Sequence, residues 1–204
     1  MARYRGPRVK VCRALGVALP GLTNKKINKQ YPPGQHGASR RGKPSDYKIR
    51  LQEKQKLRFH YGVMEKQFKG YMTEAARRKG PTGENLISLL ESRLDNLVWR
   101  LGFAPTIPAA RQMVVHGHID INGRKVDRPS YQVKVGSTIQ IREKSRQTDW
   151  IRARLELATS RVVPEYLEND LSTASGKVAQ QPSVTDLPFD VDLQQVVEYY
   201  SQML

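Results

Sequence analysis

The chain has 204 residues, of which 38% are hydrophobic, and thirty-five Lys and Arg against nineteen Asp and Glu give a formal net charge of +16. No apolar run approaches the roughly 18 residues of a membrane-spanning helix, so the sequence excludes an integral membrane protein of the helical class. Cys12 is the only cysteine, which excludes an intrachain disulfide and a zinc site built from several cysteines.

The basic residues are concentrated at the N-terminus. Residues 1–44 contain eleven Lys or Arg and no acidic residue, whereas residues 160–204 contain two basic and seven acidic residues. Such segregation favours a polyanionic partner, because each phosphate that Lys or Arg neutralises releases condensed counterions. Repeated Pro and Gly interrupt the leader, so it lacks the continuous apolar helix face that membrane-surface binding requires. We expect residues 1–44 to lack a core of their own and to become ordered on RNA.

Three helices are predicted after the leader. Ser45 or Asp46 can cap the first, which ends at Gly62. The second stops at Gly80-Pro81, and the basic residues of its last turn suit either the helix dipole or phosphate contact. Apolar residues at three-to-four spacing predict a third helix over 82–101.

A short helix and a hairpin follow. Thr106 can cap a helix that ends at Gly117, and Asn122-Gly123 is a strong signal for a type I′ hairpin turn. Further strands are predicted over 131–135 and 139–141. We expect five basic side chains to converge at one end of this sheet: Arg111, His118, Arg124, Lys125 and Arg128.

The C-terminal part is less regular. Residues 169–183 are small and polar, which predicts a surface loop. Asp192 can cap a last helix whose Val196, Val197 and Tyr200 require an apolar partner.

Particular motifs carry a family resemblance. Residues 93–142, with RLDN, TIPAARQ, HGHIDINGRKVD and PSYQV, resemble the RNA-binding motif first named for bacterial small-ribosomal-subunit protein four. That motif also occurs in pseudouridine synthases and tyrosine-type tRNA synthetases. The flanking segments MARYRGPR, PPGQHG, SDYKIRLQEKQKLRFHYGVMEKQF and EYYS are similar to the ribosomal family itself. The resemblance covers nearly the whole chain and is weakest over 147–185.

The resemblance implies an α+β fold: a mostly helical domain, an inserted small RNA-binding domain of two helices and a β-hairpin, and an extended basic N-terminal tail. The expected domains are the extension 1–44, the helical domain 45–91 completed by a C-terminal helix at 192–204, and the RNA-binding domain with its extension and surface loop at 92–191. Some relatives carry a four-cysteine zinc site in the leader, which this chain cannot form. No metal or other cofactor is expected.

The resemblance also implies a function. Members of the family are structural constituents of the small ribosomal subunit that bind a helical junction in the 5′ domain of its RNA. They nucleate assembly of the subunit body and contribute to translational accuracy with proteins five and twelve. Proteins three and five, and mRNA on its path into the subunit, are the other expected partners; no membrane is expected. The expected location is the ribosome of a bacterial cytoplasm, or of the stroma or matrix of a bacterially derived organelle.

Two other classes of function share parts of this pattern: RNA-acting enzymes and accessory RNA-binding proteins. Arg93-Leu94-Asp95 matches the tripeptide around the catalytic aspartate of pseudouridine synthases, but no large catalytic sheet domain surrounds it, so we expect Asp95 to make local contacts with a nearby Arg. A tRNA synthetase requires a nucleotide-binding domain with a Gly-rich phosphate loop, which is missing from the sequence. A free-standing RNA chaperone or ribosome-binding stress module has no need of the PPGQHG leader or the EYYS terminus.

The candidate RNA-binding residues are mostly basic, together with a few polar and aromatic side chains. The leader contributes Arg3, Arg5, Arg8, Lys10, Arg13, His36, Arg40, Arg41 and Lys43. The first helix after it contributes Tyr47, Lys48, Arg50, Lys54, Lys56 and Arg58. The motif contributes Arg93, Arg111, Gln112, His116, His118, Asn122, Arg124, Lys125 and Arg128. Tyr4, Tyr31 and Tyr47 can either stack on bases or pack within the protein.

Overall fold

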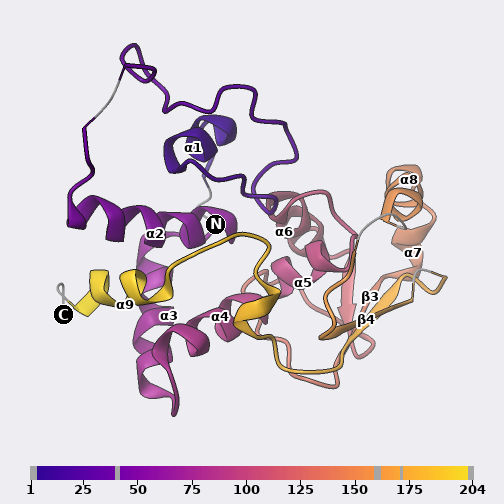
Figure 1. Cartoon of the computed structure of the whole chain (residues 1–204). Coiled ribbons are helices and arrows are strands. Elements are labelled where there is room, and N and C mark those ends of the chain that lie inside the picture. The colour runs from indigo at the N-terminus through magenta and orange to yellow at the C-terminus, as the bar shows by residue number, and fades with distance from the viewer. Residues whose placement is uncertain (1–3, 40–41, 159–161, 171, 202–204) are drawn as a thin grey trace. The chain divides into compact units, whose positions relative to one another are not determined.

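Helices and one small antiparallel sheet make up the computed structural model, which confirms the α+β class (Figure 1). The structure describes residues 4–39, 42–158, 162–170 and 172–201.

The chain forms two compact units, and each is described by itself. Unit 1 comprises residues 1–86 and 187–204, and unit 2 comprises residues 87–186. Unit 2 is therefore an insertion between the two parts of unit 1. Whether the segments 1–44, 45–91 with 192–204, and 92–191 act as domains stays a prediction.

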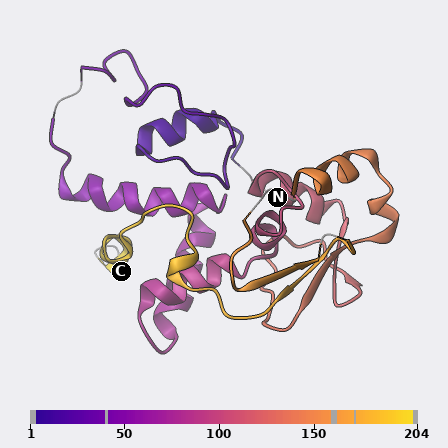
Figure 2. The same ribbon diagram turned by 45° about the vertical axis from the view of Figure 1, so that its right-hand side comes forward.

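Unit 1 is helical. Its elements are α1 (Arg8–Leu15), α2 (Asp46–His60), α3 (Glu65–Arg77), the beginning of α4 (Thr82–Glu91), and α9 (Leu193–Ser201). The α9 helix lies beside α2 in both ribbon views (Figure 1, Figure 2). Both predicted caps are confirmed: Ser45 Oγ accepts a hydrogen bond from Lys48 N at 3.4 Å, and Asp192 Oδ1 accepts one from Gln195 N at 3.2 Å.

The leader has apolar packing of its own, so the expectation that it lacks a core was wrong. Cys12, Leu19 and Leu22 are buried together, and Phe59 of α2 and Phe189 pack against them. The α1 helix presents its apolar side to α2 and ends where the chain takes a left-handed turn, which brings the next apolar residues back onto it. Burial raises the pKa of the Cys12 thiol. Ordering of the leader on RNA stays a prediction.

Unit 2 combines helices with the sheet. Its helices are the later part of α4, α5 (Leu94–Arg100), α6 (Ile107–Val115), α7 (Glu143–Arg146), α8 (Asp149–Ala158) and the 3-10 turn η1 (Val184–Asp186). Its strands are β1 (Ile119–Ile121), β2 (Arg124–Lys125), β3 (Thr138–Ile141), β4 (Leu167–Asp170) and β5 (Ser175–Val178). The strand order is β2-β1-β3-β5-β4, and every neighbouring pair is antiparallel. Figure 2 shows the strands running together at one side of the unit's helices.

The predicted hairpin is confirmed. Ile121 pairs with Arg124, which leaves a two-residue turn, and Asn122 and Gly123 have φ values of 49° and 78°. Positive φ at both positions is what a type I′ turn requires. The Asn122 side chain also accepts a hydrogen bond from Thr138 N at 2.8 Å, which ties the turn to β3.

Two predicted elements were wrong for one shared reason. The expected helix over 82–101 is broken between α4 and α5, where Arg93 is extended at φ −70° and ψ 139°. The expected strand over 131–135 forms only an isolated bridge, between Gln132 and Arg93. Carbonyl groups in and just before this segment bind the start of α5 instead: Leu94 N donates to Tyr131 O at 2.9 Å, and Asp95 N donates to Pro129 O at 3.1 Å. These bonds satisfy amides that the first turn of α5 would leave unpaired.

The expected surface loop over 169–183 was also wrong. This segment holds β5, whose pairing with β3 extends the sheet, and Ala174, Gly176 and Val178 are buried in alternation. A Cβ on Gly176 would lie 2.3 Å from Leu101 Cδ2, so the close approach to α5 requires glycine.

Candidate nucleic-acid interface

A buried ion pair lies at the start of α5, between Arg93, which precedes the helix, and Asp95 in its first turn. Arg93 Nε and Nη2 donate to Asp95 Oδ1 and Oδ2 at 3.0 and 2.6 Å, and both side chains are fully buried. Arg111 of α6 lies 3.6 Å from the same carboxylate. The expected contact of Asp95 with a nearby Arg is confirmed. A fully buried guanidinium cannot reach a phosphate, so we exclude Arg93 from the proposed interface.

A second buried carboxylate holds distant parts of unit 2 together. Glu91 accepts hydrogen bonds from Asn96 at 2.6 Å, from Arg100 at 2.7 and 3.1 Å, and from the Tyr166 hydroxyl at 2.8 Å. Burial raises the pKa of Tyr166, and the adjacent Glu91 carboxylate raises it further. Sequence reasoning missed this network, because its partners are up to 75 residues apart. The network ties the end of α4 to α5 and to Tyr166.

The joint between α6 and β1 brings basic side chains together. A Cβ on Gly117 would lie 2.4 Å from Lys125 Cε, so the Lys125 side chain crosses directly over the joint. Arg142 Nη1 donates to Gly117 O at 3.4 Å, and Arg142 Nε lies 3.4 Å from Asp120 Oδ1. Lys125 therefore lies beside Gly117, the residue next to His118. Arg142 joins them although it was not predicted.

His118 is half-buried in this joint. Its Nδ1 lies 2.9 Å from Ser145 Oγ, and its ring meets the Trp150 ring edge-on with centroids 5.5 Å apart. Burial lowers the pKa of His118, and the nearby His116 and Arg142 lower it further. The lowered pKa disfavours the charged form of the ring.

The other candidate RNA-binding residues of unit 2 differ in how much of each is exposed to solvent. Gln112, His116, Asn122, Arg124, Lys125 and Arg128 are exposed to solvent. Arg111 is instead largely covered and directed to Asp95. Of the five basic side chains expected to converge, Lys125 and His118 lie at the joint between α6 and β1, and Arg111 joins the buried ion pair. Convergence of Arg124 and Arg128 with them stays a prediction. The exposed members are placed by the hairpin turn and by the end of α6.

The basic residues of α2 mostly bind within unit 1. Arg50 pairs with Glu198 of α9 at 3.0 Å, and Lys56 pairs with Glu53 at 2.6 Å. Lys54 is buried and pairs with Glu65 at 2.9 Å, so we exclude it from the proposed interface. Arg58 lies 3.7 Å from the same carboxylate and 4.8 Å from the centre of the Phe59 ring. Lys48, which is half-buried, makes no ion pair within the part of the chain that the structure describes.

Most of the leader's cations are exposed. Among the described residues these are Arg5, Arg8, Lys10, Lys25, Lys26, Lys29 and Lys43, and His36 is exposed as well. Arg13 differs, because its guanidinium donates to Tyr31 O at 3.2 Å and to Pro32 O at 3.4 Å and thereby holds the PPGQHG segment. The predicted Arg3, Arg40 and Arg41 lie outside the described residues.

The tyrosines proposed for base stacking have partners within the protein. Tyr4 packs edge-on against Phe59 at 5.2 Å, and Tyr47 lies 5.9 Å from the Tyr199 ring although its side chain is 55% exposed. The Arg13 guanidinium lies 5.0 Å from the centre of the Tyr31 ring. These contacts favour packing as their main role.

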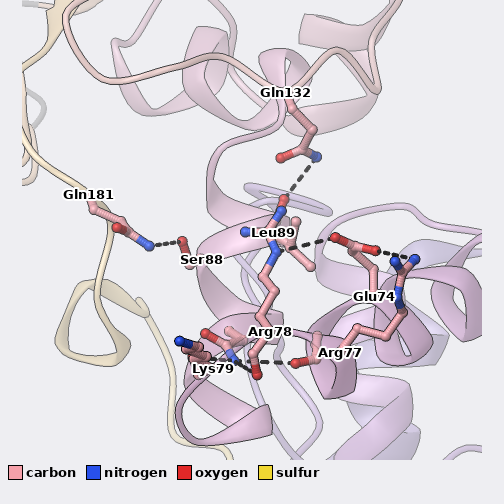
Figure 3. Close-up of polar contacts among 10 residues, drawn as sticks. Glu74, Arg77, Arg78, Lys79, Ser88, Leu89, Gln132 and Gln181 are labelled. Atoms are coloured by element: carbon pink, nitrogen blue, oxygen red, sulfur yellow. Dashed lines mark hydrogen bonds and ion pairs between the residues drawn. The ribbon is translucent and has the colours of Figure 1, made fainter.

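The end of α3 presents further cations. Arg77 Nη1 and Arg78 Nε each lie 3.5 Å from an oxygen of Glu74, and Figure 3 shows this carboxylate between the two guanidinium groups. Both arginines remain exposed, with 77% and 44% of their side chains accessible. Such long, solvated pairs contribute little to stability, so these guanidinium groups remain available to phosphate.

Two negative findings concern the described residues only. They contain no group of three or more His, Cys, Asp or Glu arranged to hold a metal ion. Among them, no helix has both the length and the apolar character to span a membrane.

Comparison with known proteins gives full-length matches. The family described as the ribosomal protein S4/S9 N-terminal domain matches residues 3–91, and the S4 domain matches residues 92–139. Proteins called small ribosomal subunit protein uS4 are similar along their whole length. The one from Picosynechococcus sp. is 51% identical and the one from Methylobacillus flagellatus 50% identical, each over 100% of both chains. That from Persephonella marina is 51% identical over 98% of this chain and 100% of its own.

Proposed function

This chain belongs to the uS4 family of small ribosomal subunit proteins, and from that premise we propose that it binds small-subunit ribosomal RNA directly through its exposed cations. The family makes it a structural constituent of the small subunit, located in the ribosome, and not an enzyme.

The observation that carries the proposal is a rigid hairpin with exposed cations at its turn. Arg124 and Lys125 directly follow a type I′ turn, Arg128 lies three residues further along the chain, and all three are exposed, while buried carboxylates hold the helices of the same unit. Because these side chains start from a fixed backbone, little conformational entropy is lost when they meet phosphates. The exposed leader cations supply a second set of contacts in unit 1.

The mode of recognition we propose is the shape of a folded RNA. The major groove of an A-form helix is too deep and narrow for side chains to read, whereas phosphates, the shallow groove and helical junctions are accessible. A surface made chiefly of Lys and Arg suits phosphates, which fix position but carry no sequence information. The family resemblance implies a helical junction in the 5′ domain of the RNA, and we propose that junction as the binding site.

The proposed biological roles follow from that site. A protein that holds several RNA helices of the 5′ domain together would nucleate assembly of the subunit body. Proteins five, three and twelve are the proposed neighbours. Through them the chain would contribute to translational accuracy and lie near the path of mRNA into the subunit.

Binding to separate RNA fragments tests the proposal. The full-length protein would be titrated with transcripts of the 5′ domain and, as a length-matched control, of the 3′ domain of small-subunit RNA. Filter binding at about 0.15 M salt should show clearly tighter binding to the 5′ domain. Crosslinking followed by mapping of the attached nucleotides should place the contacts at one junction. Equal affinity for both fragments would contradict specific recognition.

Sedimentation tests the structural role. Stoichiometric comigration with small subunits in high salt is expected of an integral component. Recovery of the protein only as free material would instead favour an accessory RNA chaperone or stress module.

A further inference from the structure

A pocket in unit 2 has no role in the phosphate contacts described above. Its volume is about 260 Å³. Apolar side chains form most of its wall: Phe103, Pro105, Met113 and Trp150. The polar side chains of Gln112 and His116 stand at its rim. Met113 is buried, whereas Gln112, His116 and Trp150 are exposed, so the pocket opens to solvent past these three side chains.

The wall formed by Trp150 is preorganised. Trp150 is 47% exposed although the next residue, Ile151, is buried and anchors α8. The Trp150 ring meets the His118 ring at an angle of 78°, and His118 in turn contacts Ser145 Oγ. The His118 ring and the buried Ile151 therefore hold the exposed Trp150 ring beside the apolar pocket. This arrangement leaves a flat aromatic surface for a planar ligand.

The surroundings of the pocket are basic. The segment 117–152, which contributes His118 and Trp150 to the pocket, contains eight Lys or Arg and four Asp or Glu along the chain. Lys125 crosses the joint next to His116 and His118, and 40% of the Arg142 side chain is accessible there. A ligand that combines a planar apolar group with a negative charge matches this arrangement.

We propose that this pocket receives one unstacked base of the small-subunit RNA and that Trp150 is its stacking surface. The proposal rests on the proposed function, since it requires that the chain bind RNA. Pockets for drug-sized ligands occupy roughly 300–1,000 Å³, so the smaller volume here suits a single base. Proteins recognise unpaired RNA bases by stacking them on aromatic rings, with phosphates held by nearby cations.

An apolar side chain from a neighbouring protein is the competing occupant. It would use the same wall, but it would gain nothing from the surrounding positive charge. The charge therefore favours the base, and the experiment separates the two.

The test compares Trp150→Ala and Trp150→Phe with the unaltered full-length protein. Each would be titrated with a transcript of small-subunit RNA. Loss of one base–aromatic stack should weaken binding roughly five- to one-hundred-fold in Trp150→Ala, whereas Trp150→Phe should retain most of the affinity. Tyr131→Ala is the matched control, because Tyr131 is also an exposed aromatic residue of unit 2 but does not line the pocket.

Two further measurements report on the pocket itself. The chain has two tryptophans, and Trp99 is buried whereas Trp150 is exposed. Quenching of tryptophan fluorescence on RNA binding should therefore come from Trp150. Chemical modification of the RNA should reveal one or two bases that are protected in the complex, exposed again with Trp150→Ala, and protected with Trp150→Phe.

Each outcome decides the proposal. Unchanged affinity and base protection with Trp150→Ala would overturn the pocket while leaving RNA binding intact. A defect that appears only when other small-subunit proteins are present would overturn it in favour of a protein occupant. If the unaltered protein does not bind the RNA, the proposed function fails and the pocket proposal with it.

Discussion

At the scale of single residues, Asp95 provides the negative charge that two arginines of unit 2 share. Arg93 is fully buried against it at 2.6 Å, and Arg111 approaches it at 3.6 Å. Asp95→Asn keeps the shape of the side chain but removes the negative charge that both guanidinium groups approach. Because a buried charge that loses its partner is costly, the free energy of unfolding should fall by about 3–5 kcal/mol. Urea unfolding of the full-length protein measures this change.

Glu84→Gln is the control for Asp95→Asn. Glu84 is also acidic and lies on a helix, but it is exposed, so its replacement should change the unfolding free energy by no more than about 0.5 kcal/mol. Similar stability of both variants would show that Asp95 does not anchor the scaffold.

Glu65 gives unit 1 a pH-dependent contribution to stability. Partial burial raises its pKa, but hydrogen bonds from Lys54 and Tyr200 outweigh burial and leave the pKa below its ordinary value of 4.5. The folded state therefore binds this proton less readily than the unfolded state. The stabilisation is fully present above about pH 4.5 and is lost as pH falls through the lower, folded-state pKa.

A comparison of unfolding free energies between pH 7 and pH 3 tests this contribution. The unaltered protein should lose more stability on acidification than Glu65→Gln, which has no charge to lose at this position. Parallel pH profiles for the two proteins would contradict the assigned role of Glu65.

Sequence reasoning at this scale succeeded where partners are local. Asp95 was expected to contact a nearby Arg, and Arg93 lies only two residues away, in the extended position that precedes α5. Glu91 and Tyr166 could not be paired in advance, since 75 residues separate them and only the fold brings them together. The exposure of Trp150 accompanies the burial of its neighbour Ile151, which only the structure shows.

At the scale of elements, caps and turns were predictable because their chemistry is local. Ser45, Asp192 and Asn122-Gly123 each fulfil their expected role. The break at Arg93 was not predictable from periodicity, because it depends on backbone hydrogen bonds with residues 129–133. The β5 strand was missed for a similar reason: its small residues suggest a loop until Leu101 is known to pack on Gly176.

Two glycine-to-alanine substitutions test this account of the elements in opposite directions. Gly176→Ala places a methyl group against the buried Leu101 and should destabilise the protein by about 1–3 kcal/mol. Gly70→Ala lies on the exposed side of α3 with nothing within 4 Å, so better helix propensity should stabilise it by about 0.5–1 kcal/mol. Thermal unfolding of both variants measures the difference. Destabilisation of equal size at both positions would show that contact with Leu101 does not decide the effect.

At the scale of the whole molecule, the net charge overstates the number of cations available to RNA. Several basic residues of α2 and the helices of unit 2 are already paired with Glu198, Glu65, Glu53, Glu91 or Asp95. The sequence predicts the sign and the distribution of charge, but only the structure separates scaffold pairs from exposed contacts. The exposed set is therefore the better guide to the number of phosphates bound.

The salt dependence of RNA binding counts those phosphates. If about eight are neutralised, log K should fall against log salt with a slope of roughly −6 to −7. Replacing Arg124, Lys125 and Arg128 together with Ala should weaken binding and make the slope less steep by about 2–3, because three phosphate contacts are lost.

Lys177→Ala is the control for this triple variant. Lys177 is an exposed cation in the acidic C-terminal part, so its replacement should leave the slope unchanged. The triple variant should unfold at the temperature of the unaltered protein, since these side chains are exposed. A slope near −1 for the unaltered protein, or an equal loss of stability and binding in the triple variant, would contradict binding through surface phosphate contacts.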